Sequence, residues 1–340
     1  MLKTILQPIH SVHLPSPGSF QGQTVLVTGS NTGIGLETTR HAVSLGASKI
    51  IMGVRTVEKG EKAREDILSK LPEGKSAKTS IEVWQLDMSS FQSVMTFVQR
   101  MKDYITLPGN RLDTAILNAG LASGVWQLSP DGWEIQIQVN GLSTALLSLE
   151  LLPILISSAS SSPSRPHLVI VSSDMHQQAL LPERSAPNIL DVLNDKEHWQ
   201  KMHAKSPVER YAVSKMFNQW TNIEVAKLVP LDHAAQEKVI VTSATPGFCK
   251  SELLSREEGA PWLLKVVQAA CARTAADGAK AIVDAAVRQD GHGKWLENQK
   301  LTDPGHIVSS LEGRKIQKKA WKEILDVLRK VDPDLRLDFS

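Results

Sequence analysis

Tyr211 and Lys215, in the run Tyr-Ala-Val-Ser-Lys, are the residues whose types and spacing most directly indicate chemistry. On a helix, positions i and i+4 share one face, so this spacing places an ammonium group beside a phenol. A nearby positive charge stabilises the phenolate and lowers the pKa of a tyrosine. A phenol tuned in this way can pass a proton to or from a substrate oxygen. The same pair also occurs by chance on exposed helices, so the surrounding elements decide its meaning.

A glycine-rich turn follows a short apolar run near the start of the sequence. Residues 24–27 are Thr-Val-Leu-Val, which predicts a buried parallel strand. Residues 28–35 are Thr-Gly-Ser-Asn-Thr-Gly-Ile-Gly, and a helical pattern continues to Gly46. Glycines allow a backbone to approach a pyrophosphate, and a helix N-terminus offers free N–H groups to it. The order strand, glycine turn, helix therefore predicts a dinucleotide site, although three residues rather than one separate the first two glycines.

The end of the next predicted strand, 49–54, indicates which cofactor is bound. A carboxylate at that point would bind the ribose 2′-hydroxyl, whereas an arginine accommodates a 2′-phosphate. Arg55 stands there with no acidic residue beside it. This favours NADP(H), and the alternative is a solvated surface arginine.

The rest of the sequence continues to alternate predicted strands and helices. Further strands are predicted at 81–86, 114–117, 167–171 and 239–244, and helices at 90–102, 131–156, 211 to about 229, and near 261–288. Such alternation predicts a single doubly wound, Rossmann-like parallel sheet with helices on both faces. Ligands bind these sheets beyond the carboxyl ends of the strands, which is where the polar clusters of this sequence stand.

Taken in order, these motifs resemble those of the short-chain dehydrogenases/reductases over roughly residues 22–300. The motifs are Thr28-Gly29-x-x-x-Gly33-x-Gly35, Asp87, Asn118-Ala119-Gly120, Asn140, Ser172-Ser173, Tyr211-x-x-x-Lys215 and Pro246-Gly247. The runs 139–143 and 246–254 are similar to the retinol-dehydrogenase-like branch, and the chain is most similar to reductases of fungal secondary metabolism. The resemblance implies an NADP(H)-dependent oxidoreductase acting on a small molecule.

The resemblance also implies a role for each matching residue. Tyr211 would be the general acid in reduction and the general base in oxidation, and Lys215 would lower its pKa and hold the nicotinamide ribose. Ser173 would hydrogen-bond the substrate oxygen, with Ser172 as the alternative, and Asn140 would support a water that links Lys215 to solvent. The residues implied to contact the cofactor are Gly29, Asn31, Gly33, Ile34, Gly35, Arg55, Asp87, Asn118, Gly120, Tyr211, Lys215, Gly247, Phe248 and Ser251.

One segment departs from the family pattern. Tyr211 lies 38 residues after Ser173, further than the family usually has, and the additional segment spans about 176–208. Insertions at strand ends form the walls of sites, which favours a substrate lid over a simple surface insertion. The serine-rich loop at 156–166 is of low complexity and receives no role.

Composition limits the remaining classes of protein. The chain has 340 residues with 38 basic and 36 acidic ones, a net charge of +2, and no basic block. This argues against nucleic acid as the main partner. The continuous alternation predicts one domain, with a helical extension at about 301–340. Cys249 and Cys271 give no disulfide framework and predict a reducing compartment, the cytoplasm. The histidines show no metal-ligand spacing.

Three apolar stretches were considered as membrane or targeting segments. The patch at 5–9 is too short for a signal sequence, and 142–156 is better explained as a core helix than as a membrane span. The stretch 309–330 has the pattern of an amphipathic helix that packs on its own domain. We therefore expect no stable membrane insertion.

Two classes of function remain open. Intact Tyr211, Lys215 and Ser173 favour a reductase that converts a ketone or aldehyde to an alcohol, or the reverse dehydrogenase. A wall formed by Trp126 and Phe248, together with Leu180, would suit a bulky, largely apolar substrate. The alternative is a non-redox cyclase or isomerase, or a cofactor-sensing protein, on the same scaffold. The sequence also leaves open whether the chain forms a homo-oligomer.

Overall fold

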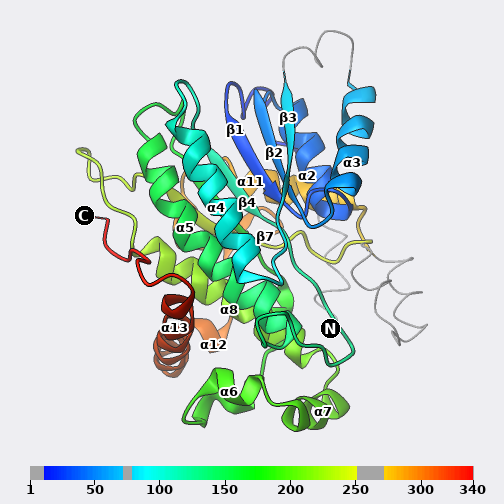
Figure 1. Cartoon of the computed structure of the whole chain (residues 1–340), viewed down its shortest axis with the longest axis vertical. Helices are drawn as coiled ribbons and strands as arrows, with labels where there is room; N and C mark the ends of the chain where they lie inside the picture. The colour runs from blue at the N-terminus through cyan, green and yellow to red at the C-terminus, as the bar shows by residue number, and fades with distance from the viewer. Residues whose placement is uncertain (1–10, 72–78, 251–271, 340) are drawn as a thin grey trace.

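One eight-stranded sheet forms the centre of the molecule, with its strands in the order β3-β2-β1-β4-β5-β6-β7-β8 (Figure 1). The computed structural model describes residues 11–71, 79–250 and 272–339. The strands are β1 (Thr24–Thr28), β2 (Lys49–Val54), β3 (Ser80–Gln85), β4 (Thr114–Leu117), β5 (His167–Val171), β6 (Ile240–Ala244), β7 (Trp295–Glu297) and β8 (Lys300–Thr302). All neighbouring strands pair in parallel except β7 and β8, which are antiparallel.

Helices cover both faces of this sheet. On one face lie α2 (Gly33–Ser44), α3 (Val57–Ser69) and α11 (Ala275–Ala285); on the other lie α4 (Phe91–Thr106), α5 (Ser143–Ser158) and α8 (Glu209–Ala226). Side chains alternate across a strand, so Val25 and Val27 of β1 enter the first core and Leu26 enters the second. The predicted doubly wound α/β sheet is confirmed. The chain order changes direction between β1 and β4, which is where such folds bind ligands.

Two predicted helices differ from the observed ones. The expected helix 131–156 is instead a π-helical turn, η2 (Ile137–Leu142), followed by α5. The Glu134 carboxylate explains the late start, because it accepts hydrogen bonds from the backbone N–H groups of Gln136 (3.2 Å) and Ile137 (3.0 Å) and so caps the helix there. The helix expected near 261–288 is α11, although residues 261–271 lie outside the described residues.

The sequence patterns did not indicate α3, β7 or β8. The two strands have three residues each, too few to show an alternating pattern. The sequence predicted a parallel sheet, whereas the observed sheet ends in one antiparallel strand, β8.

The segment between β5 and α8 contains η3 (Asp174–Gln178), η4 (Pro182–Ser185), α6 (Ile189–Leu193) and α7 (Lys196–Lys205). In Figure 1, α6 and α7 lie together beyond α8, on the opposite side from the loops at the top of the view. We call residues 176–208 the insertion. It adds an outer layer beside the helix that carries Tyr211.

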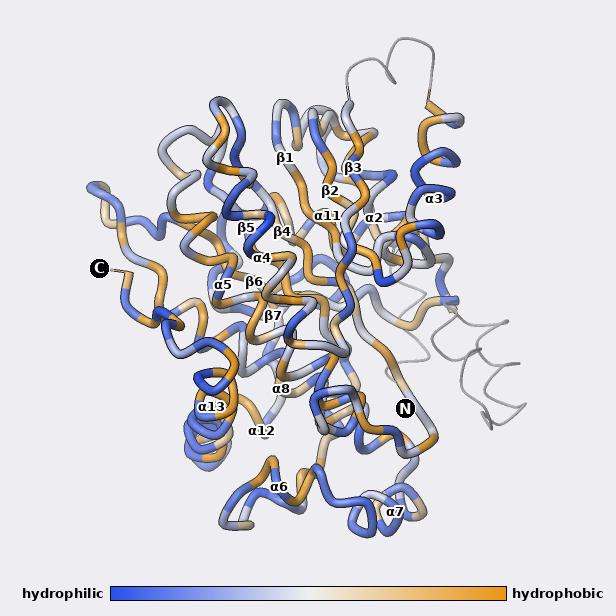
Figure 2. The backbone as a smooth tube through the Cα atoms, viewed as in Figure 1, coloured by the Kyte–Doolittle hydropathy of each residue, from blue (hydrophilic) through white to orange (hydrophobic). Residues whose placement is uncertain are grey.

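The C-terminal part of the chain forms α12 (His306–Ser309) and α13 (Leu311–Val331). The expectation that this helix is amphipathic and packs on its own domain is met, because Ala320, Ile324 and Leu328 are fully buried. Figure 2 shows hydrophilic and hydrophobic residues alternating around α13. Ile137–Ser158 is long and apolar enough to span a membrane, but 89% of its most apolar window is buried inside the molecule, as in a core helix.

Candidate active site

Hydrogen bonds connect α8 to the carboxyl end of β5. Lys215, on α8, donates from Nζ to the Val171 carbonyl at 3.1 Å. Ser172 donates from Oγ to the Lys215 carbonyl at 2.9 Å, and Asn218 donates from Nδ2 to the Val171 carbonyl at 3.2 Å. These bonds fix the register of α8 against the strand end. They bring Tyr211, one turn before Lys215, to the same edge of the sheet as the two serines.

Lys215 is buried, and burial lowers its pKa to about 8. Its Nζ lies 5.8 Å from the centroid of the Tyr211 ring. The predicted pairing of ammonium and phenol on one helix face is therefore present.

The two serines at the end of β5 differ in what their hydroxyl groups do. The Ser172 hydroxyl is buried and is used in the bond to Lys215. Ser173 is half-buried and caps η3: its Oγ accepts from the backbone N–H of Met175 at 3.2 Å, and Asp174 Oδ1 lies 3.4 Å away. The Ser173 Oγ therefore accepts from the cap and donates to Asp174 Oδ1 over the long distance of 3.4 Å. The O–H of Ser172 is committed to a shorter, buried bond, so this geometry favours Ser173 over Ser172 as the group that meets a substrate.

Asn140 lies in the π-helical turn η2 and is completely buried. Its Nδ2 donates to the Leu121 carbonyl (2.7 Å) and to Ser214 Oγ (2.9 Å), and its Oδ1 accepts from Leu121 N–H (2.9 Å). A Cβ on Gly120 would stand 3.1 Å from Asn140 Oδ1 and 3.2 Å from Lys215 Nζ. Asn140 and Lys215 therefore flank Gly120, and the Asn140 amide is engaged within the protein.

The glycine turn between β1 and α2 has the shape that a dinucleotide site needs. Gly29 (φ +64°) and Gly33 (φ +56°) adopt the left-handed conformation that favours glycine. A Cβ on Gly35 would stand 2.3 Å from the Gly29 carbonyl oxygen. Asn118 donates from Nδ2 to the Thr28 carbonyl at 3.0 Å and so pins the turn to the end of β4. Asn31 and Ile34 are half-buried in the same turn.

Two other predicted cofactor contacts lie at strand ends beyond this turn. Arg55 follows β2, is exposed, and forms no hydrogen bond or ion pair with any residue that the structure describes. Asp87 follows β3, and its Oδ1 accepts from Ser89 N–H (2.9 Å) and Ser89 Oγ (2.7 Å). The Asp87 carboxylate is thus hydrogen-bonded within the turn that follows β3.

The turn after β6 holds the last predicted contacts. Gly247 is left-handed (φ +77°), and its N–H donates to Thr245 Oγ1 at 3.0 Å. Phe248 is half-buried, and its carbonyl accepts from Arg273 N–H at 2.9 Å. Ser251 lies outside the described residues. Burial raises the pKa of Cys249 to about 12, which opposes a reactive thiolate.

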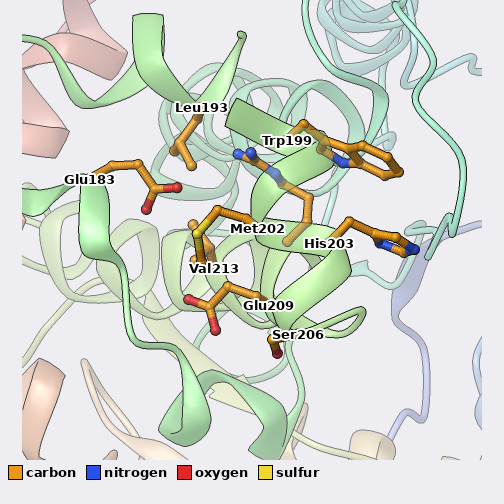
Figure 3. Close-up of a pocket in the computed structure, with 9 residues that line it drawn as sticks. Glu183, Leu193, Trp199, Met202, His203, Ser206, Glu209 and Val213 are labelled. Carbon is orange, nitrogen blue, oxygen red and sulfur yellow. The ribbon is translucent and has the colours of Figure 1, made fainter. Parts of the chain in front are cut away.

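Aromatic rings form part of the insertion. Trp126 and Trp199 meet edge to face with their centroids 6.0 Å apart, and Trp199 stacks on His203 at 4.5 Å. Leu180, which we expected in the substrate wall, is 62% exposed. Figure 3 shows Trp199 and His203 beside a cavity of about 10 Å³ between α7 and α8. That cavity is too small for a substrate and belongs to the packing of the insertion.

The sequence patterns did not reveal a buried group of charges at the start of α8. Arg210 precedes Tyr211, is 6% exposed, and faces the carboxylates of Glu134, Glu183 and Glu209. Burial lowers the Arg210 pKa, and the three carboxylates oppose that shift. The Glu209 carboxylate accepts from the backbone N–H groups of Leu180 (2.9 Å) and Leu181, and Glu183 lies 2.6 Å from His198 Nε2. These contacts hold the insertion against α8. We refer to Arg210 and the three glutamates as the Arg210 junction.

Comparison with known proteins agrees with this arrangement. The family model described as short chain dehydrogenase matches residues 23–181. The short chain dehydrogenase/reductase dmxR8 of Cryptosporiopsis is 36% identical over 334 residues, covering 96% of this chain and 97% of that protein. The short-chain dehydrogenase fogG of Aspergillus ruber is 38% identical over 318 residues, covering 90% and 85%.

Solved structures share the fold at lower identity. The NADPH-bound carbonyl reductase from chicken fatty liver has a TM-score of 0.56 and 18% identity, and covers 87% of this chain and 97% of its own. A short chain dehydrogenase of Shigella flexneri complexed with NADP has a TM-score of 0.55 and 20% identity, and covers 84% and 100%. Together with the full-length relatives and the geometry at the ends of β1, β5 and α8, these similarities show that the chain belongs to the short-chain dehydrogenase/reductase family.

Proposed function

We propose that this chain is an NADP(H)-dependent oxidoreductase that interconverts a ketone or aldehyde and an alcohol on a bulky, largely apolar small molecule of fungal secondary metabolism. The observation that carries the proposal is the placement of Lys215 and Ser173. Lys215 is bound to the end of β5 beside Tyr211, and the Ser173 hydroxyl, whose donation to Asp174 Oδ1 spans 3.4 Å, stands at the same strand end. Relatives of matching length are named as dehydrogenases or reductases.

The glycine turn supports a dinucleotide cofactor. It stands at the N-terminus of α2, where N–H groups and the helix dipole favour a phosphate. Gly35 has no room for a side chain, because a Cβ there would meet the Gly29 carbonyl and the Asn118 amide. The hydroxyl of Ser30, inside the turn, is buried and has no hydrogen-bond partner in the part of the chain that the structure describes, as expected of a group that a ligand would satisfy. The two solved structures described above bind NADP or NADPH.

Each residue then has a distinct task. NADPH, when bound, supplies the hydride. Tyr211 gives its phenolic proton to the substrate oxygen in reduction and takes it back in oxidation. Ser173 donates a hydrogen bond to the same oxygen and orients it. Lys215 stabilises the phenolate through its charge, and Asn140 holds the Leu121 backbone beside it.

Tyr211→Phe is the decisive test of this proposal. The substitution keeps the ring and its packing but removes the transferable proton. Loss of general acid–base catalysis should lower turnover at least about a hundredfold, with NADPH binding largely unchanged. A panel of carbonyls and alcohols, followed at the nicotinamide absorbance, measures the effect. If the Phe variant turned over at the parent rate, or if the parent converted substrate with no change in that absorbance, the proposal would be wrong.

Arg55→Ala tests the choice of cofactor. Arg55 is exposed and lacks a partner among the described residues, so it is available to a 2′-phosphate. Loss of one charge-assisted contact of about 1.5 to 3 kcal/mol should narrow the preference for NADPH over NADH about tenfold or more. Lys70→Ala, at the far end of α3, makes the same change in net charge and should leave the preference intact. Equal affinity of the parent for both cofactors would contradict the assignment.

A further inference from the structure

The outer face of α13 carries a line of exposed basic side chains. They lie three, four or seven residues apart, spacings that share one face of a helix, and they are Lys315, Lys318, Lys322 and Arg329. The line is about 21 Å long at the rise of an α-helix. We call these four residues the basic stripe. α13 stands at the outer edge of the molecule, with its opposite face buried against the core (Figure 1).

The basic stripe concentrates positive charge. α13 has seven basic and three acidic residues, a net charge of +4, whereas the whole chain has +2. Asp326, on the same face, pairs with Lys322 at 2.6 Å. Lys315 and Lys318 form no hydrogen bond or ion pair with any residue in the described part of the chain. Their ammonium groups are thus available to an external anion.

Three exposed apolar side chains adjoin one end of the basic stripe. Leu311, the first residue of α13, is 78% exposed and stands four residues before Lys315, on the same face. Leu180 is 62% exposed and Val208 is 47% exposed. We call Leu180, Val208 and Leu311 the apolar patch. Exposed apolar side chains that gather in one place mark an interaction site, whereas single ones do not.

Polar contacts bring the members of the apolar patch together. Arg184 donates from Nη1 to the Leu180 carbonyl at 2.7 Å, and its Nε lies 3.8 Å from Glu312, next to the first residue of α13. Glu209, at the start of α8, accepts from the Leu180 N–H at 2.9 Å. The patch is therefore built from the insertion, the start of α8 and the start of α13.

An anionic phospholipid surface matches both parts of this face. Its headgroups attract a row of lysine and arginine side chains, and apolar side chains beside the row enter the boundary between headgroups and acyl chains. The basic stripe lies on the convex outer side of a helix. A flat surface fits that shape, whereas an acidic peptide is usually held in a groove or along the edge of a sheet.

We propose that the basic stripe and the apolar patch dock the protein on an anionic phospholipid surface. The contact is peripheral, because the apolar face of α13 is buried in the core that it shares with α8. The patch adjoins the start of α8, which carries Tyr211. Docking there brings the site close to lipid, where a bulky apolar substrate dissolves. That consequence rests on the proposed function, whereas the docking does not.

Sedimentation of the full chain with vesicles tests the docking. The parent should partition onto vesicles of phosphatidylcholine with about 30% phosphatidylserine at least tenfold more strongly than onto pure phosphatidylcholine. The preference should disappear at about 0.5 M NaCl, because salt screens exposed charges. A parent that bound neither kind of vesicle, or both equally, would overturn the proposal.

Reversal of charge at two positions locates the electrostatic contact. Lys315→Glu with Lys318→Glu should weaken partitioning onto the anionic vesicles about tenfold or more. Lys62→Glu with Lys70→Glu is the matched control, since it makes the same change in net charge on α3, which covers the other face of the sheet. The control should stay within about twofold of the parent. An equal loss in both double variants would show that net charge, and not the stripe, governs binding, and the proposal would be wrong.

The apolar patch has its own matched pair of variants. Leu180→Ser with Leu311→Ser should weaken partitioning about fivefold or more and keep the preference for anionic vesicles. Leu107→Ser with Leu231→Ser changes two other exposed leucines, each 57% exposed, and should stay within about twofold of the parent. Parent-like partitioning of the Leu180 and Leu311 variant would contradict the part assigned to the patch.

Poly-glutamate separates a lipid surface from an acidic protein segment. It offers negative charge without acyl chains, so the parent should bind it at least about tenfold more weakly per charge than the anionic vesicles. Binding as tight as to vesicles would show that the face recognises an acidic protein, and would overturn the assignment to lipid.

Turnover of a water-soluble carbonyl distinguishes this proposal from the proposed function. Without vesicles, the Lys315 and Lys318 double variant should keep the parent kcat, because both side chains are exposed on α13 and away from Tyr211. If the parent docked on anionic vesicles but oxidised no nicotinamide with any carbonyl, the docking would stand and the proposed function would fall. If it turned over a carbonyl but did not dock, the reverse would hold.

Discussion

At the scale of single residues, the ammonium group of Lys215 is the charge around which the proposed chemistry is arranged. Among the described residues it has one hydrogen bond, to the Val171 carbonyl, and burial is the cause of its lowered pKa. Burial without a paired anion is the reason that its pKa falls to about 8. An anionic cofactor would supply the missing charge and raise that pKa again. The site is thus prepared for a negative ligand.

The first prediction follows from the sign of this shift. Below the Lys215 pKa of about 8 the ammonium is charged and attracts the cofactor; above it the amine is neutral and the attraction is lost. Kd for NADPH should be nearly constant between about pH 7 and 7.5, and should rise by up to about tenfold per unit above pH 8. Fluorescence titration measures this dependence. Lys215→Met should bind more weakly and show no such rise, and a parent Kd unchanged up to about pH 9.5 would contradict the assignment.

Gly35 offers a second prediction at the same scale. In Gly35→Ala the new Cβ would stand 2.3 Å from the Gly29 carbonyl oxygen and 2.5 Å from Asn118 Nδ2, so the turn must move. We expect NADPH to bind at least about tenfold more weakly, because the backbone no longer follows the pyrophosphate.

Gly33→Ala is the matched control in the same turn. Its Cβ would meet nothing within 4 Å, and only the left-handed conformation would be strained, at about 1 kcal/mol. Calorimetric titration of both variants tests the difference. Equal losses of affinity would show that conformational strain, and not the close approach at Gly35, governs the turn.

At the scale of elements, α8 is held at its beginning by the Arg210 junction. The junction joins three parts of the chain: the turn before η2 through Glu134, the insertion through Glu183, and α8 itself through Glu209. One guanidinium faces three carboxylates, and burial raises the pKa values of Glu134 and Glu209. The charge of Arg210 opposes both of these shifts.

Arg210→Leu should expose this dependence. Removal of the cation leaves three buried carboxylates with their hydrogen bonds but without the guanidinium charge, which should cost about 3 to 5 kcal/mol of unfolding free energy. Arg184→Leu in the same insertion is the control: its side chain is 46% exposed and lies 3.8 Å from Glu312, so the loss should stay below about 1 kcal/mol. Urea unfolding measures both variants. A loss below 1 kcal/mol in Arg210→Leu would show that the junction does not stabilise the fold.

The elements were predictable from the sequence to the extent that each carries its own local signal. The strand at 24–28 is an unbroken run of apolar and β-branched residues, and the carboxyl ends of parallel strands must meet at one edge, so Ser172 and Lys215 could be placed together in advance. The Arg210 junction gave no such signal. Its partners lie on distant segments, and a single charged residue does not show in the sequence whether it is buried.

The predicted boundaries of one helix were wrong for a related reason. A continuous helix was expected over 131–156 because the apolar pattern is uniform there, whereas the Glu134 carboxylate caps the chain, so that the helix starts at Ile135 and becomes π-helical from Ile137. The first turn is then π-helical, which directs Asn140 toward Leu121 and Ser214. Wider turns of this kind often stand at functional sites. The spacing of apolar residues alone does not distinguish a π-helical turn from an α-helical one.

At the scale of the whole molecule, the insertion and the C-terminal extension brace each other. Glu323 of α13 accepts from the backbone N–H groups of Ile189 (2.8 Å) and Leu190 (3.1 Å) at the start of α6. Gln317, also on α13, donates to Glu224 Oε1 of α8 at 2.6 Å. The insertion is thus attached on several sides. These attachments favour a fixed wall over a lid that opens and closes.

Ile324→Asp tests how much the fold relies on α13. Ile324 is fully buried in the same apolar core as α8, so a charged side chain there should cost about 4 kcal/mol or more and lower the melting temperature accordingly. Leu311→Asp, at the first residue of the same helix, is 78% exposed and should change stability by no more than about 0.5 kcal/mol. Scanning calorimetry compares them. Similar melting temperatures for the two variants would mean that α13 contributes little.

The place of α13 in the chain also sets a condition on how the protein is made. Translation passes the last residue of α8, Ala226, 85 residues before it reaches Leu311. At ordinary rates of synthesis this interval lasts roughly 4 to 17 s. During that time the apolar side of α8 that later receives α13 has no cover from within the chain. A nascent chain in this state is a substrate for chaperones, so the yield of folded enzyme in a foreign host should depend on chaperone supply as well as on the stability of the finished molecule.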